Sequence, residues 1–86
     1  MFYFYILRSQ KNNKLYLGYT TDLKARLKSH NSSENKATKP NAPYDLIYYS
    51  AFTSQPDALE CEKYFKTTAG WKRIHSMLKN TLDKPL

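Results

Sequence analysis

The sequence predicts one α+β domain, with a small, mainly antiparallel sheet of three strands flanked by three helices in the order β-β-α-β-α-α. Three short runs rich in aromatic and β-branched residues indicate the strands, and the segments between and after them carry apolar residues at helical spacing. A chain of 86 residues buries only about 60–65% of its unfolded surface, which is enough for one small core. With no repeat or linker, we expect a single domain over residues 1–80 and a frayed tail over residues 81–86.

The first strand is expected over residues 2–8, where apolar side chains occupy both faces of the strand. One face carries Tyr3, Tyr5 and Leu7, and the other carries Phe2, Phe4 and Ile6. Because both faces are apolar, this strand should lie in the centre of the sheet and be covered on both sides.

A polar turn at residues 10–13 leads to a second strand at residues 14–19, and the two strands should form a β-hairpin. Its register remains open. Pairing Tyr5 with Tyr16 centres the loop between residues 10 and 11, whereas the Asn-Asn pair would centre it two residues later. A bulge could reconcile the two.

A helix should follow Gly18, which ends the regular part of the second strand. Thr20 or Thr21 is expected to cap this helix, with Asp22 in its first turn.

Within this helix, Leu23 and Leu27 should face the core. Arg26 and His30 are four residues apart along the edge of that apolar stripe, so both are expected to be half-shielded where the helix meets the sheet.

Residues 31–43 contain no large apolar side chain and predict a long surface loop, which is followed by a third strand over residues 44–53. Ser54 should open a second helix, and Gly70 should separate it from a last helix over residues 71–80.

In the second helix, Glu62 shares the inward side with Ala58, Cys61 and Phe65. An inward carboxylate needs a cationic partner or a metal ion. In the last helix Trp71, Ile74 and Leu78 should point inward.

Fourteen Lys and Arg against seven Asp and Glu give a net charge of +7, which favours a polyanionic partner, nucleic acid ahead of an anionic membrane surface. Plain solubility is the alternative, but eight tyrosines favour nucleic acid, since tyrosine packs while presenting a hydroxyl.

A single cysteine, Cys61, excludes an internal disulfide and a cysteine-based zinc cluster. With neither a signal peptide nor an apolar run near 20 residues, we expect a cytoplasmic protein without membrane association.

Five segments, in order, resemble the motifs of the GIY-YIG nuclease superfamily, specifically its single-domain members related to the N-terminal nuclease domain of excinuclease C. The segments are Tyr3-Phe4-Tyr5, Tyr16-Leu17-Gly18, the run from Tyr19 through Arg26 to His30, the segment from Thr38 to Tyr49, and the segment from Ala58 through Glu62 to Lys66. The first motif departs from the family name, with Tyr3 in place of glycine and Phe4 in place of isoleucine.

The resemblance implies roles for individual residues in hydrolysing a phosphodiester bond. Tyr16 would be the general base, Tyr5 its hydrogen-bonding companion, and Arg26 the phosphate ligand. Glu62 would hold one Mg²⁺ or Mn²⁺ ion, bound weakly without substrate because magnesium keeps most of its waters. His30 would orient a tyrosine hydroxyl or a metal-bound water. An ordinary tyrosine is phenolate in about one molecule per thousand at neutral pH, so a base role requires a nearby cation.

These expectations define an endonuclease that acts on branched, nicked or single-stranded DNA by structure rather than sequence, with DNA repair or recombination as the setting. The favoured state is a monomer. Lys14, Lys39 and Lys63 are candidate contacts to the phosphate backbone. Two alternatives stay open: a nucleic-acid-binding module that keeps the fold with little turnover, and an interaction domain for another kind of partner.

Overall fold

The computed structural model describes residues 1–32 and 38–83, and its centre is an antiparallel sheet of three strands. The strands are β1 (Phe2–Ser9), β2 (Leu15–Thr20) and β3 (Tyr44–Phe52), in the spatial order β2-β1-β3. The first strand is therefore central, as its two apolar faces predict, and the α+β fold class is confirmed.

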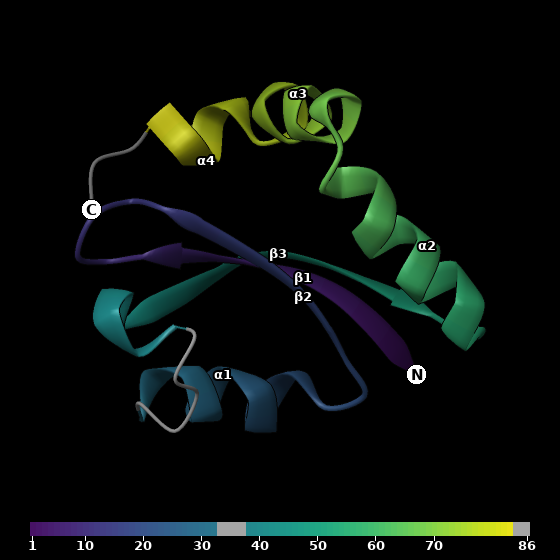
Figure 1. The fold of residues 1–86 in the computed structure, drawn as a ribbon, viewed down its shortest axis with the longest axis horizontal. Helices are drawn as coiled ribbons and strands as arrows, with labels where there is room; N and C mark the ends of the chain where they lie inside the picture. The colour runs from purple at the N-terminus through teal and green to yellow at the C-terminus, as the bar shows by residue number, and fades with distance from the viewer. Residues whose placement is uncertain (33–37, 84–86) are drawn as a thin grey trace.

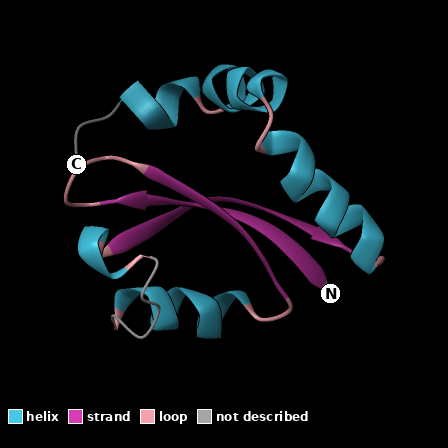
Figure 2. Cartoon of the chain, in the orientation of Figure 1, coloured by secondary structure: helices cyan, strands magenta, loops and turns pink. Residues whose placement is uncertain are grey.

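The helices cover the two faces of the sheet unequally (Figures 1 and 2). On one face lie helix α1 (Leu23–Asn31) and the short 3₁₀ helix η1 (Lys39–Asn41). The helices on the opposite face are α2 (Gln55–Phe65), α3 (Thr68–Met77) and α4 (Lys79–Asp83).

Alternation along β1 divides the buried side chains between these two faces. Phe4 and Ile6 belong to the apolar core beneath α2 and α3, and both are fully buried. Tyr5 and Leu7 point the other way, into a second cluster beneath α1. The predicted division of β1 into two apolar faces is confirmed.

The hairpin register falls midway between the two alternatives that the sequence leaves open. Tyr5 pairs with Gly18 and Leu7 pairs with Tyr16, so the loop is centred between residues 11 and 12. The Ser9 amide donates to the carbonyl of Lys14 over 2.9 Å and closes the loop. Asn13 takes a φ of 64°, a left-handed conformation that asparagine tolerates well.

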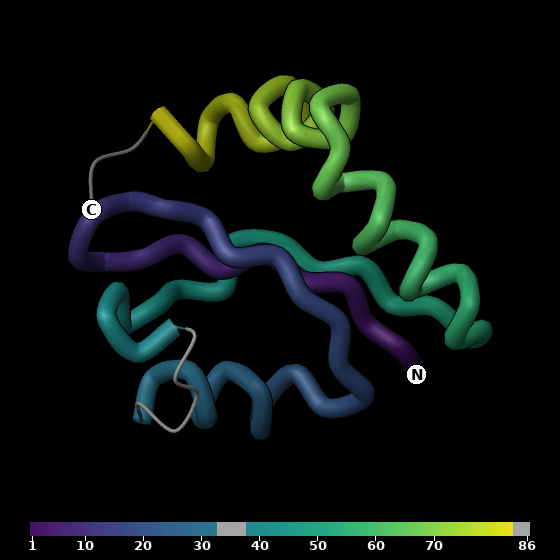
Figure 3. Tube along the Cα trace, viewed as in Figure 1, coloured from purple at the N-terminus to yellow at the C-terminus, as the bar shows by residue number. Residues whose placement is uncertain are grey.

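Gly70 does not separate two helices, as the sequence suggests, but lies within α3. The helix begins three residues earlier, because the Thr67 side chain caps it by accepting from the Gly70 amide over 3.1 Å. A Cβ on Gly70 would overlap the backbone of Tyr64 and Phe65, so the residue lets α3 turn tightly away from α2, as the tube in Figure 3 shows. Trp71 is 42% exposed instead of inward.

Half of the segment expected to be frayed, residues 81–83, is helical. Residues 81–83 lie in α4, Leu82 packs against the core, and Arg8 donates to the Thr81 carbonyl over 3.2 Å. Residues 84–86, and residues 33–37 of the expected surface loop, lie outside the described residues. In the described part of the chain, no helix has the length and apolar character needed to cross a bilayer.

Candidate active site beneath helix α1

Helix α1 is capped by neither threonine that the sequence proposes, because its N-cap lies one residue after Thr21 and two after Thr20. Asp22 is the N-cap, and its carboxylate accepts from the Ala25 amide over 3.0 Å. Thr20 instead supports the preceding turn, since its hydroxyl oxygen accepts from the Asp22 amide over 3.1 Å. These bonds fix where α1 leaves the edge strand β2.

Arg26 and His30, expected to be equally half-shielded, differ in the structure. His30 is completely buried in the last turn of α1, whereas Arg26 one turn earlier is exposed. The helix therefore presents a cation to solvent and an imidazole to the sheet.

Gly18 allows the Tyr5 side chain to lie across the edge strand. Tyr5 and Gly18 are direct partners in the β1–β2 ladder, so a Cβ on Gly18 would point to the same face as Tyr5. That Cβ would overlap the Tyr5 ring and its hydroxyl. The glycine of the second motif is thus required by the tyrosine of the first, because only a residue without a side chain leaves room for the phenol.

A buried chain of hydrogen bonds joins β1, α1 and the segment before η1. The Tyr5 hydroxyl lies 3.0 Å from His30 Nε2, and His30 Nδ1 lies 2.7 Å from the Thr38 hydroxyl. A neutral imidazole donates at one nitrogen and accepts at the other, so the chain is continuous in either direction. Thr38 is 1% exposed and Tyr5 2%, which makes these bonds necessary for satisfying buried polar groups.

Two further tyrosine rings surround this imidazole. The Tyr16 ring lies 4.9 Å from that of His30, and the Tyr44 ring lies 6.1 Å from it on β3. The Tyr5 and Tyr16 rings are 6.5 Å apart. The structure therefore brings together Tyr5, Tyr16 and His30, three of the residues that the family resemblance selects.

The electrostatics of Tyr5 and His30 assign them different protonation behaviour. Burial, followed by Tyr16, raises the pKa of Tyr5 well above its usual value of 10.0, with Glu62 acting in the same direction and Arg26 opposing. Burial, followed by Arg26, lowers the pKa of His30 below 6.5. At neutral pH Tyr5 is therefore a protonated phenol and His30 a neutral imidazole.

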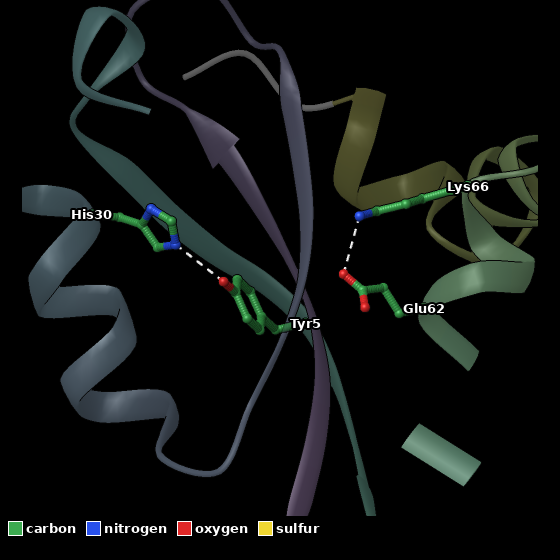
Figure 4. Close-up of polar contacts among 4 residues, drawn as sticks. All are labelled: Tyr5, His30, Glu62 and Lys66. Carbon is green, nitrogen blue, oxygen red and sulfur yellow. Dashed lines mark hydrogen bonds and ion pairs between the residues drawn. The ribbon is translucent and has the colours of Figure 1, made fainter. Parts of the chain in front are cut away.

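Glu62 lies across the sheet from this cluster. Figure 4 shows Tyr5 and His30 on the α1 side of the strands and Glu62 with Lys66 on the α2 side. Glu62 accepts from Lys66 Nζ over 3.0 Å, and its side chain is 22% exposed. Since Glu62 and Arg26 both influence the pKa of Tyr5, the carboxylate and the guanidinium act electrostatically on one hydroxyl from different helices.

A metal ion at Glu62 would depend on water for most of its ligands. Within residues 1–32 and 38–83, His, Cys, Asp and Glu side chains form no group of three that could hold an ion. A lone, partly exposed carboxylate fits Mg²⁺, which usually retains several waters and takes one or two protein carboxylates. It does not fit Ca²⁺, which takes six to eight oxygen ligands, or zinc.

The three candidate phosphate-contacting lysines lie on separate elements. Lys14 precedes β2, Lys39 opens η1 and Lys63 lies on α2, and all three are exposed. Lys14 also lines a surface pocket of about 560 Å³ together with Trp71. Their contacts with nucleic acid stay a prediction.

The sequence assigns no role to three residues that build the site. Thr38 closes the hydrogen-bond chain, and the Tyr44 hydroxyl donates to the Thr38 carbonyl over 3.2 Å. Asn31 accepts from the Tyr44 amide over 2.6 Å and donates to its carbonyl over 3.1 Å, which ties the end of α1 to the start of β3. Each looks like an ordinary turn or strand residue, and only their long-range contacts reveal these positioning functions.

Comparison with known proteins agrees with the motif order and the fold. The family model described as the GIY-YIG catalytic domain matches residues 1–74, which includes Tyr5, Tyr16, Arg26, His30 and Glu62. The chain belongs to the GIY-YIG nuclease family.

Its relatives include small proteins that carry no activity in their names. A UPF0213 protein of Pediococcus pentosaceus is 41% identical over 83 residues, covering 95% of this chain and 86% of the relative. UPF0213 protein YsiG of Lactococcus lactis is 40% identical, covering 95% and 80%, and UPF0213 protein YazA of Bacillus subtilis is 40% identical, covering 74% and 65%. No solved structure matches the chain.

Proposed function

We propose that this protein is a divalent-metal-dependent endonuclease that hydrolyses phosphodiester bonds in DNA, selecting its substrate by structure rather than by sequence. The observation that carries the proposal is the buried chain Tyr5–His30–Thr38 beside Tyr16. A fold that only had to be stable could fill this space with apolar side chains. Instead it buries a protonated phenol and a neutral imidazole next to a second tyrosine.

The two tyrosines take different roles in this proposal. The raised pKa keeps Tyr5 protonated at neutral pH, so its hydroxyl donates a hydrogen bond and orients its neighbours instead of acting as the base. Tyr16, at a half-buried position on the edge strand, first releases its own proton to solvent and then, as the phenolate, accepts the proton of the attacking water. His30 holds the Tyr5 hydroxyl in place, and Thr38 fixes the imidazole ring from its other nitrogen.

Charge neutralisation comes from residues on the two helices. Arg26 is exposed on α1 and presents a planar guanidinium suited to two oxygens of a phosphate. Glu62 would hold Mg²⁺ or Mn²⁺, which supplies positive charge at the scissile phosphate when bound.

A cleavage assay with a matched arginine variant tests this function. Branched, nicked and single-stranded DNA are incubated with Mg²⁺ or Mn²⁺ and wild type, Arg26→Ala or Lys24→Ala. We expect Arg26→Ala to lower the cleavage rate by about 100- to 1,000-fold, as for loss of one transition-state contact. Lys24 lies on the same helix and is also exposed, so Lys24→Ala should stay near wild type. Equal cleavage by wild type and Arg26→Ala would refute the mechanism.

The Lys66–Glu62 ion pair favours a second candidate function, a DNA-binding module with little turnover, because the carboxylate already has a cationic partner. This candidate predicts salt-dependent binding and no cleavage with any divalent metal. Glu62→Gln separates the two functions. In a nuclease it should abolish cleavage while DNA binding persists, and in a binding module it should leave binding unchanged or stronger with no cleavage to lose.

A further inference from the structure

Trp71 occupies an unusual place for the only tryptophan of the chain. Helical spacing predicts that it joins the core, yet 42% of its surface is exposed on α3, while Ile74 and Leu78 fill the core position. Its ring lies 5.4 Å from that of His75, one turn further along the helix. A large aromatic surface on a basic protein offers stacking to a planar ligand.

A surface pocket of about 320 Å³ adjoins this indole where α2 meets α3. Its lining consists of Lys66, Thr67, Thr68, Trp71 and Lys72. The lining therefore combines two cations, two hydroxyl side chains and an aromatic ring, with no acidic residue among them. These are the groups that bind a nucleotide without reading its sequence: an aromatic surface for the base and ammonium groups for the phosphate.

Lys66 connects this pocket to the proposed metal ligand. Its ammonium group donates to Glu62 over 3.0 Å, while the same side chain lines the pocket and is 55% exposed. An ammonium group has three N–H donors, so Lys66 can bind a phosphate oxygen while it faces the carboxylate. A DNA strand bound in this pocket would therefore lie next to Glu62.

We propose that the pocket at the α2–α3 junction binds an unpaired nucleotide of a DNA strand, with its base stacked on Trp71 and its phosphate held by Lys66 and Lys72. This binding site adds a substrate contact to the proposed nuclease function. It depends on that function only in the assumption that Glu62 holds the metal. It specifies the substrate as DNA with at least one unpaired nucleotide next to the bond that is cut. Fully paired, blunt duplex lacks a base that can reach the indole.

Intrinsic fluorescence of the full-length chain reports on this site directly, because all tryptophan emission comes from Trp71. A short single-stranded oligonucleotide should quench this emission in a saturable way. An abasic oligonucleotide of the same length carries the same phosphates without bases, and it should bind with little quenching. Blunt duplex DNA should also cause little quenching.

Variants separate the stacking contact from general charge. Trp71→Ala should weaken binding of the oligonucleotide by about 5- to 150-fold, measured by anisotropy of a labelled strand, and Trp71→Phe should recover part of the loss. Lys72→Ala should weaken binding and reduce the dependence of log affinity on log salt concentration by about 0.7. Arg73 is exposed on the same helix and lines neither described pocket, so Arg73→Ala serves as the matched control for position on α3.

The outcomes distinguish this site from the nuclease function. Binding by anisotropy without a change in Trp71 emission would overturn the site and leave the nuclease proposal standing. Equal quenching by the abasic strand would also overturn it, because phosphate binding alone would then explain the signal. Base-dependent quenching without cleavage would support the site and count against the nuclease. A complete absence of DNA binding would overturn both.

Discussion

The two faces of the sheet share a central strand and differ in almost everything else. Beneath α2 and α3, Phe4 stacks on Phe65 with ring centroids 5.0 Å apart, and the surrounding core is apolar. Beneath α1, the residue next to Phe4 in sequence, Tyr5, directs its hydroxyl to a buried histidine. The first face is held by apolar packing, and the second combines a smaller apolar cluster with directional hydrogen bonds.

This difference shows how a small domain combines stability with a polar site. With 86 residues the protein has room for one substantial apolar core, and α2 and α3 provide it. The α1 face can then bury Tyr5, His30 and Thr38, whose polar groups satisfy one another at defined positions. Period-two alternation of a single strand, β1, separates the two tasks.

Replacing a core residue on the α2–α3 face should have the largest effect on stability. Ile74→Ala removes a fully buried side chain, and we expect the free energy of unfolding to fall by about 2–5 kcal/mol in urea denaturation. Cleavage per folded molecule should be unchanged, since Ile74 is completely buried in the core and belongs to neither the proposed active site nor the proposed nucleotide pocket. Leu59→Ala deletes a similar side chain at a 42% exposed position of α2, and its effect should stay within about 0.5 kcal/mol. A large loss of specific activity in Ile74→Ala would argue against the division of tasks.

Gly18→Ala tests the α1 face through the contact with Tyr5. The added methyl group would overlap the Tyr5 ring, so we expect about 1–3 kcal/mol of destabilisation together with loss of the bond to His30. The same substitution in a Tyr5→Ala background should be much milder, because the overlapping ring is gone. Urea denaturation of the four proteins in this double-mutant cycle measures the coupling. Additive effects would show that Tyr5 and Gly18 do not restrict each other.

The sequence predicts the sheet and its faces well because both follow from local pattern. Apolar residues on both faces of residues 2–8 identify the central strand, and the inward positions of Ile74 and Leu78 follow from helical spacing. The same spacing is wrong for Trp71, which lies near the start of α3 and is 42% exposed. Periodicity gives the direction of a side chain around the helix axis but does not show which turns of the helix lie against the core.

The candidate site is predictable only in part, for a similar reason. The motif positions select Tyr5, Tyr16 and His30, and the structure brings them together. Thr38, which satisfies His30 from eight residues away, lies among polar residues with no periodic pattern. His30 is buried and Arg26 is exposed because the end of α1 packs closely against the sheet. A tertiary contact, such as that of Asn31 with Tyr44, determines this packing.

Lowering the pH should reduce the stability that the protein gains from buried His30 beneath α1. The pKa of His30 is lowered in the folded protein, so the unfolded chain takes up the proton first. The stability from a neutral His30 is thus fully present above about pH 6.5 and is lost as pH falls toward the folded-state pKa, with a slope of at most about 1.4 kcal/mol per pH unit. Urea denaturation between pH 7 and pH 5 should show this slope, which His30→Gln should remove. His75→Gln, at an exposed histidine, should retain it.

The smallest expected effect concerns the ion pair on the other face. If Glu62 holds the metal, the Lys66 ammonium competes with that ion for the carboxylate. Exposed pairs of this kind contribute about 0.2–1 kcal/mol, so Lys66→Ala should raise the affinity for Mn²⁺ by only about 1.5- to 5-fold in a calorimetric titration. Lys63→Ala removes an equal charge one residue from Glu62 without breaking the ion pair, and its gain should be smaller. Equal gains in both variants would mean that Lys66 acts only through its charge and not through the ion pair, and no gain in Lys66→Ala would mean that Glu62 is not the ligand. Glu62 would then have only its ion pair with Lys66, and the metal would have to be held by other residues.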